Sequence, residues 1–215
     1  MTRHHGIDEP GTVYVARLQR STAVLGPGDR AAVWVQGCEL RCHGCLAAET
    51  HPRGGTPYAV EALVDWLVAA GGDGVTFSGG EPMLQAAALT RVVDLLRTRR
   101  PGLSVMVYTG YRLEWLRRSG APAQRALLER ADLLVDGPYV ERRHAPLRWR
   151  GSRNQRLIDL SGLHAGQLTP DVSAGLELEL DEQLGLLVTG VPPLPHLRDW
   201  LAGVTSADET AASGS

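Results

Sequence analysis

The sequence contains no lysine, because all 22 of its basic residues are arginine. This absence excludes a mechanism that needs a Schiff-base lysine or a P-loop lysine. The formal net charge is only −2, so the chain has no overall charge that would attract nucleic acid or an anionic membrane surface. We therefore expect no nucleic-acid partner and no membrane partner.

Long apolar runs are also missing, since no run approaches the roughly 20 residues needed to cross a bilayer. The polar beginning of the chain, with His4, His5 and Asp8, lacks the apolar core of a signal peptide. We therefore expect a cytoplasmic protein. Cysteine is scarce, and all 3 cysteines fall within residues 38–45. In a reducing compartment, such clustering favours metal binding over a disulfide framework.

Strand-like and helix-like segments alternate along the first two thirds of the chain. Strands are expected at 13–18, 31–35, 74–77, 103–108 and 133–135, and helices at 56–70, 82–96, 111–118 and 122–131. The second of these strands begins at Ala31, and the first helix is expected to start at Thr56-Pro57, read as an N-cap and first helical residue. This α/β alternation predicts a parallel sheet, either open or curled into a partial (β/α) barrel.

The pattern changes towards the C-terminus. Residues 156–160, 176–180 and 186–189 look like strands, and 181–183 look like a hairpin turn. We therefore expect a core domain over residues 12–160, a small C-terminal β extension over 161–204, and a disordered tail over 205–215.

The residues with notable chemistry follow the predicted strands. Loops after the carboxyl ends of parallel strands are where function gathers in such sheets. In this sequence those loops hold the cysteines, Ser78-Gly79-Gly80-Glu81, Thr109-Gly110 and Asp136-Gly137. The sequence therefore predicts one functional site at this edge of the sheet.

Cys38, Cys42 and Cys45 are separated by three and two residues, which lets one loop present all three thiolates to one metal centre. A closed zinc site would need a fourth ligand, such as His43 or His51. A four-iron cluster held by three cysteines instead leaves one iron open to bind a cofactor or substrate. A structural zinc site or a simple redox centre stays an alternative at this point.

The order Cys-x3-Cys-x2-Cys after one strand and Gly-Gly-Glu-Pro after the next resembles the radical S-adenosylmethionine superfamily. The resemblance implies a [4Fe-4S] cluster on Cys38, Cys42 and Cys45, whose open iron chelates S-adenosylmethionine and cleaves it to a 5'-deoxyadenosyl radical. It also implies that the backbone around Ser78, Gly79 and Gly80, with the Glu81 carboxylate, holds the methionine amino group. We place Thr109 in the same cofactor-binding set.

Further segments resemble the activating proteins of anaerobic ribonucleotide reductase and related glycyl-radical enzymes. They are residues 26–30, 108–111, 136–139 and 150–156, and the resemblance covers about residues 12–160. It implies an activase that removes a hydrogen atom from a glycine Cα of a partner protein. We expect a flavodoxin- or ferredoxin-type reductant. Gly44 stands where much of the superfamily has an aromatic residue that packs on adenine, although the reductase activases share this glycine.

Partner or substrate contacts are expected from Asp136, Arg150, Arg153 and Asn154. The surrounding segment 142–156 holds six arginines, which suit carboxylates of a cofactor or partner but could equally form a solvated basic face. Two alternative functions stay open at this stage. One is a radical enzyme that acts on a small molecule or peptide, and the other is a non-catalytic metal-binding or electron-transfer protein.

Overall fold

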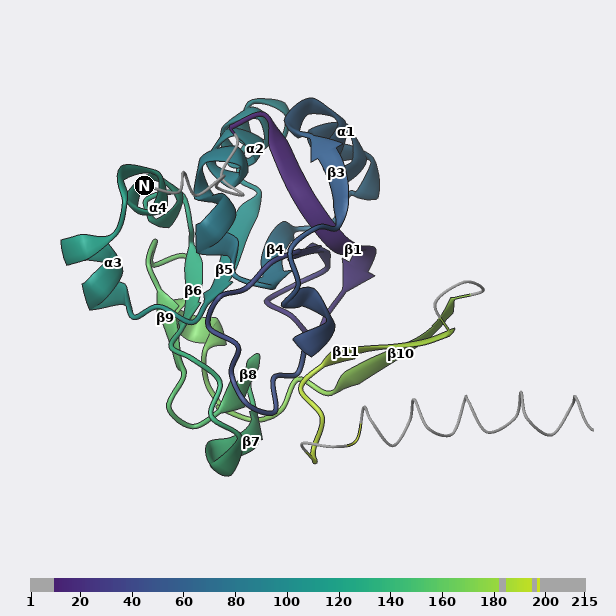
Figure 1. Cartoon of the computed structure of the whole chain (residues 1–215), viewed down its shortest axis with the longest axis vertical. Coiled ribbons are helices and arrows are strands. Elements are labelled where there is room, and N and C mark those ends of the chain that lie inside the picture. The colour runs from purple at the N-terminus through teal and green to yellow at the C-terminus, as the bar shows by residue number, and fades with distance from the viewer. Residues whose placement is uncertain (1–9, 182–184, 195–196, 198–215) are drawn as a thin grey trace, which may run out of the picture.

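The computed structural model describes residues 10–181, 185–194 and 197. Its centre is a seven-stranded sheet with the strand order β3-β1-β2-β4-β5-β6-β9 (Figure 1). These strands are β1 Thr12–Thr22, β2 Arg30–Val35, β3 Thr56–Ala59, β4 Gly74–Gly79, β5 Ser104–Thr109, β6 Leu133–Asp136 and β9 Arg156–Asp159. The helices are α1 Val60–Ala70, α2 Ala86–Arg99, α3 Leu113–Ser119 and α4 Pro122–Leu128, with short 3-10 turns at Ala48–Thr50, Pro82–Gln85, Glu141–Arg143 and Ala165–Gln167.

The central strands β2, β4, β5 and β6 run parallel, as the alternation of strands and helices predicted. The outer strands do not. β1 pairs antiparallel with both β2 and β3, and β9 pairs antiparallel with β6. The sheet is therefore mixed, with a parallel centre that brings the predicted functional loops to one edge.

The predicted start of the first helix at Thr56-Pro57 is wrong. Residues Thr56–Ala59 form β3, whose Pro57 pairs with Tyr14 of β1. Proline has no backbone N–H to donate, so it is accepted on a strand at the edge of a sheet. The helix begins at Val60, which is buried with Leu63, Val64 and Leu67.

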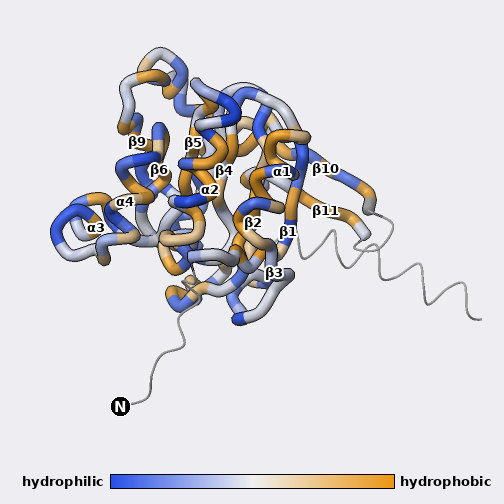
Figure 2. The backbone as a smooth tube through the Cα atoms, turned by 90° about the horizontal axis from the view of Figure 1, so that it is seen from above, coloured by the Kyte–Doolittle hydropathy of each residue, from blue (hydrophilic) through white to orange (hydrophobic). Residues whose placement is uncertain are grey.

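The two faces of the sheet have different coverings. The larger apolar core lies between the sheet and helices α1, α2 and α4, and it includes Val33, Phe77 and Val107. On the opposite face, Trp34 and Tyr108 belong to smaller apolar clusters. Figure 2 shows the resulting hydrophobic centre of the fold, where β2, β4 and β5 are rich in hydrophobic residues, as is usual for buried parallel strands.

Arg30 anchors the turn between β1 and β2 from inside the protein. Its side chain is 0% exposed and donates five hydrogen bonds, all to uncharged oxygens. The acceptors are Thr76 Oγ1, Pro27 O, Val75 O, Ser104 O and Ser104 Oγ. Burial lowers the pKa of the Arg30 guanidinium to about 10. The residue therefore ties the turn to β4 and β5.

Substituting Arg30→Met should destabilise the fold, because it leaves three buried carbonyl groups without their donor. Each unsatisfied buried acceptor costs about 1–3 kcal/mol, so we expect a loss of about 3 kcal/mol or more. For a chain of this size, that corresponds to a melting temperature about 6–12 °C lower. Anaerobic thermal unfolding of the cluster-loaded protein measures it. Arg20→Met, at an exposed position of β1, is the control and should change the melting temperature little. Equal melting temperatures for Arg30→Met and the native protein would contradict this role.

The C-terminal part adds two small antiparallel sheets to the fold. β7 His144–Leu147 pairs with β8 Arg150–Ser152, and β10 Leu176–Asp181 pairs with β11 Gly185–Gly190. The strands predicted at 176–180 and 186–189 are present as the hairpin β10-β11. Most of its predicted turn and the whole predicted tail, residues 205–215, lie outside the described residues. None of the helices in the described part is both long and apolar enough to cross a membrane.

Candidate functional site

One cavity opens at the carboxyl ends of the parallel strands. Its volume is about 920 Å³, counting the part that is open to solvent. The residues of the two main sequence motifs line it together: Cys38, Cys42, Cys45, Ser78, Gly79, Gly80, Glu81, Thr109 and Gly110. The structure thus brings all of the predicted metal and cofactor residues to one place.

The cysteine loop is held by its backbone. Gly37 N donates to Thr50 O (2.8 Å), and Cys38 N donates to His51 O (3.1 Å). All three thiols are partly buried, and burial raises their pKa values, that of Cys45 to about 11. They share the cavity, but among the described residues no three such side chains converge closely enough to hold a single metal ion.

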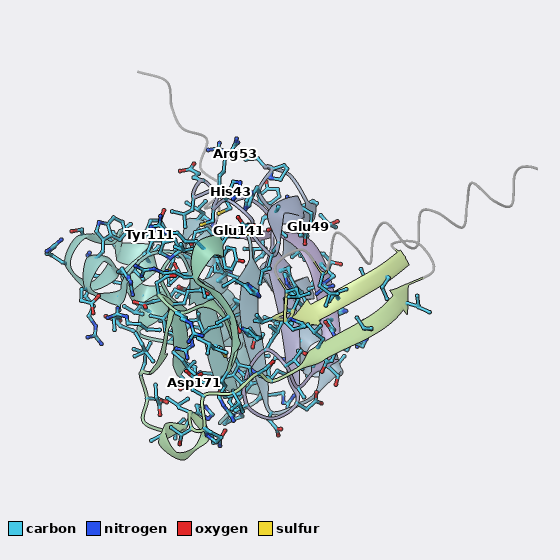
Figure 3. The ribbon with its side chains drawn as sticks, turned by 90° about the horizontal axis from the view of Figure 1, so that it is seen from below. His43, Glu49, Arg53, Tyr111, Glu141 and Asp171 are labelled. Atoms are coloured by element: carbon cyan, nitrogen blue, oxygen red, sulfur yellow. The ribbon has the colours of Figure 1, made fainter. Side chains whose placement is uncertain are left out.

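Gly44 has a structural reason to be glycine. Its φ is +66°, and a Cβ atom at this position would lie 2.5 Å from Glu141 Oε1. The Glu141 side chain also makes a 2.8 Å hydrogen bond with Nδ1 of His43, whose side chain is 90% exposed. Figure 3 shows these two side chains together beside the cysteine sulfurs. The space in which a larger residue 44 would lie is therefore occupied by Glu141.

The second loop packs directly against the first. Gly80 N donates to Val35 O (2.8 Å), and Glu81 N donates to Gly37 O (2.9 Å). A Cβ atom on Gly80 would lie 2.3 Å from Gly37 O, so only glycine allows the two loops to approach this closely. The glycine spacing is thus required by backbone packing beside the cysteines.

Glu81 is the buried carboxylate of the cavity, at 1% exposure. It accepts hydrogen bonds from Met83 N (2.9 Å), Thr109 Oγ1 (2.8 Å) and Gly110 N (2.9 Å). Burial raises its pKa to about 7, although these hydrogen bonds favour the charged form. No cationic side chain is among these partners. Glu81 is therefore poised to accept a further hydrogen bond from a positively charged or amino group.

The four residues predicted to contact a partner or substrate do not line this cavity. Asp136 is fully buried and bound by the Arg156 and Arg112 side chains. Arg150 pairs with Asp171, and Asn154 Nδ2 donates to Pro138 O (2.7 Å). Arg153 is exposed. Three of the six arginines in this segment, Arg148, Arg150 and Arg156, therefore hold the fold together through local partners.

Several cavity residues were not among those predicted from sequence. Tyr108, Tyr139, Trp149, Gly151 and Gln155 line the cavity, as does Trp34. Gln155 shapes the 151–155 turn, since its Oε1 accepts from the backbone N–H groups of residues 151 and 152. The resemblance of the 150–156 segment was the only signal for it.

Two buried nitrogens in the cavity lining lack partners. Within the part of the chain that the structure describes, neither Nε2 of His51 nor Nε1 of Trp149 has a hydrogen-bond partner. Buried polar groups are normally satisfied, so such atoms indicate a bound group that supplies the missing partner. The cavity therefore combines thiols, a buried carboxylate and unsatisfied nitrogens, all of which can bind a ligand.

Comparison with known proteins gives the family. Residues 24–158 match the model of a 4Fe-4S single cluster domain. The anaerobic ribonucleoside-triphosphate reductase-activating protein of Vibrio cholerae is 35% identical over 141 residues, which are 61% of this chain and 88% of that protein. The chain belongs to this family of activating proteins. It is a radical S-adenosylmethionine enzyme whose family binds an iron-sulfur cluster.

Other members extend the comparison. The activating protein of the same name from Enterobacteria phage T4 is 31% identical, over 66% of this chain and 90% of its own. The pyruvate formate-lyase-activating enzyme of Clostridium pasteurianum is 36% identical, over 45% of this chain and 39% of its own. Among solved structures, QueE from Escherichia coli covers 56% of this chain and 68% of its own, at 18% identity and a TM-score of 0.40.

The residues of the activating protein fit its cofactors. Three cysteine thiols, a buried carboxylate and glycine backbone line one cavity. Thiolates are the ligands that iron-sulfur clusters need, and metal binding deprotonates thiols whose pKa is raised in its absence. The donor set therefore matches a cluster with an adjoining organic cofactor.

Proposed function

We propose that this activating protein generates a glycyl radical on a partner protein, an anaerobic ribonucleotide reductase. The observation that carries the proposal is the shared cavity of three thiols and the buried Glu81 carboxylate, in a chain that matches 88% of a reductase-activating protein. The printed names of the relatives supply the class of partner.

Within this proposal, Cys38, Cys42 and Cys45 hold the cluster, and Ser78, Gly79, Gly80, Glu81 and Thr109 hold S-adenosylmethionine. Glu81 would accept from the methionine amino group, since its two oxygens are held by Thr109 and Gly110, which line the same cavity. Thr109 acts through Glu81, to which its hydroxyl donates. The backbone of residues 78–80 is supported by its hydrogen bond to β2.

When bound, the cluster and S-adenosylmethionine would supply, with one external electron and loss of methionine, a 5'-deoxyadenosyl radical able to remove a hydrogen atom from a glycine Cα of the partner. The chain itself positions the cofactor and the substrate and excludes water from the cavity. Its aromatic lining, in which Trp34 and Trp149 are buried and Tyr108 is half-buried, serves the second purpose.

Electron paramagnetic resonance tests the proposal. The reconstituted protein, S-adenosylmethionine, a one-electron reductant and a reductase labelled with α-deuterated glycine are incubated without oxygen. We expect a glycyl radical signal on the reductase and deuterium in the 5'-deoxyadenosine. Cofactor cleavage that yields neither radical nor deuterium with the reductase of the same organism would contradict the proposal. It would favour a small-molecule substrate.

The proposal includes the finer features expected from sequence. We propose that the mixed sheet curls as a partial barrel, with residues 12–160 as the catalytic domain and 161–204 as an extension. We also propose a cytoplasmic location and a flavodoxin- or ferredoxin-type reductant. The need of the family's cluster for an external electron supports the reductant.

A further inference from the structure

The segment after β9 lies beyond the family match, which ends at residue 158. We call the described residues 160–181 and 185–194 the C-terminal strap. It leads from β9 at one edge of the sheet to the hairpin β10-β11, which meets β1 near the other edge (Figure 1). Since the matched stretch takes up 88% of the Vibrio cholerae relative, that protein has little sequence left for such a segment.

The first half of the strap is fastened to the sheet face that is opposite the helices. Nε2 of the buried His164 makes a 2.9 Å hydrogen bond with Ser104 Oγ of β5. Further along, Asp171 pairs with Arg150, and Arg148 donates to Pro170 O (2.9 Å) and Gln167 O (3.0 Å). Figure 3 places Asp171 well away from the cysteine loop. The strap is therefore fixed before it reaches the cavity.

The hairpin is fastened to β1 by polar side chains. Glu177 accepts from Ala23 N (2.8 Å), and the Thr189 hydroxyl accepts from Arg17 (2.9 Å) and donates to Gln19 (2.8 Å). These bonds join residues more than 150 positions apart in the sequence. They hold the base of the hairpin at the β1 side of the cavity.

Directly after this anchor, the strap becomes part of the cavity. Gly190 and Val191 are buried and line it with the cysteines, and the next residue is fixed by His144, whose Nε2 bonds to Pro192 O (2.9 Å). A Cβ atom on Gly190 would lie 2.6 Å from Gly175 O, so the chain passes too close for any other residue. The contacts of Gly190 and Pro192, the residues before and after it, thus fix Val191 in the wall of the cavity.

Val191 belongs to the apolar part of the cavity lining, together with Leu25, Trp34, Tyr108 and Trp149. The thiols, Glu81 and the glycine loop account for the cluster and the methionine part of the cofactor. The apolar lining is therefore available to the adenosine part of the cofactor and to the group that meets the radical.

We infer that the C-terminal strap forms the inner wall of the reaction cavity and that Val191 is a specificity-determining residue. The Val191 side chain limits which substrate main chain has room to reach the radical. The inference rests on the proposed function. The substrate class is an extended peptide segment with an uncharged neighbourhood around its glycine. A charged side chain there would be buried against apolar surface without a partner.

The test compares a variant that narrows the cavity at position 191 with a variant that widens it. Val191→Trp should lower glycyl radical formation on the reductase at least tenfold, while cofactor cleavage without the reductase stays within twofold of the native rate. Val191→Ala should raise deuterium transfer from a reductase whose target glycine is replaced by deuterated alanine at least fivefold, because the wall then has room for a methyl group. Leu163→Trp, at a 69% exposed strap position, is the control and should change neither.

The outcomes separate this inference from the proposed function. Failure of the native protein to cleave the cofactor or to act on the reductase would overturn the proposed function. Native activity with unchanged substrate handling in both Val191 variants would overturn the inference alone. Loss of partner-free cofactor cleavage in Val191→Trp, with iron content unchanged, would also overturn it, because the wall would then contact the cofactor instead of the substrate.

Discussion

Replacement of Cys42 by alanine should abolish cluster assembly and lower radical formation at least 100-fold. The chain has only 3 cysteines, so two thiolates would remain to hold the cluster. Iron and sulfide should fall from about four per chain towards zero after anaerobic reconstitution. Metal analysis and the visible absorbance of the cluster measure this result.

His43→Ala is the matched control for this substitution. His43 is adjacent to Cys42, but its side chain is 90% exposed and pairs with Glu141. We expect full cluster content in this variant, because an exposed pair of this kind contributes little to stability. Intact cluster absorbance in Cys42→Ala would disprove the three-cysteine ligand set. Loss of metal in His43→Ala would instead make His43 a ligand and favour a zinc-type site.

Replacement of Glu81 by glutamine should weaken S-adenosylmethionine binding about 10–100-fold while the cluster stays intact. The expected change corresponds to one hydrogen bond to a charged group, about 1.5–3 kcal/mol. The amide also has an N–H group in place of one carboxylate oxygen. This N–H group would face a backbone N–H or hydroxyl group that now donates to the carboxylate. Equilibrium binding to the reconstituted protein measures the affinity. Glu39→Gln, at an exposed position of the cysteine loop, is the control.

The raised pKa of Glu81 gives this prediction a pH dependence. With a folded-state pKa of about 7 against the usual 4.5, the carboxyl group is largely protonated at pH 6 and ionised at pH 8. The affinity ratio of native protein to Glu81→Gln should therefore grow from pH 6 to pH 8. The same shift stabilises the cofactor-free fold below pH 4.5, and this contribution is lost as pH rises to about 7. A pH-independent affinity ratio would contradict the assignment of Glu81 to the amino group.

The central strands and most helices could be predicted because their signals are local. The buried face of α1 follows from Val60, Leu63, Val64 and Leu67 at helical spacing. The error at Thr56-Pro57 has a non-local cause, since a proline that could open a helix instead pairs at the sheet edge with β1. β1 and β9 were predicted as strands, but their antiparallel pairing also depends on non-local contacts and was not predicted.

The residues of the candidate site also differ in whether they could be predicted from the sequence. The cysteines and Ser78–Glu81 could be found because each motif is continuous and follows a strand. Trp149 and Gln155 had no comparable signal, since their place in the cavity depends on how the 137–156 segment folds back over the sheet. Tyr108, for example, donates to Trp149 O across 41 positions of sequence.

By itself, the sequence determined the kind of chemistry: three cysteines at fixed spacing and a glycine-rich loop with one carboxylate are short-range features that no distant contact can change. Only the tertiary structure decided the shape of the space beside them. The anchors of the strap, such as Glu177 on Ala23 and His144 on Pro192, join residues far apart in the chain. Residue spacing carries no record of such contacts, because they depend on the packing of the whole fold. Val191 therefore became a candidate for substrate selection only when the chain was folded.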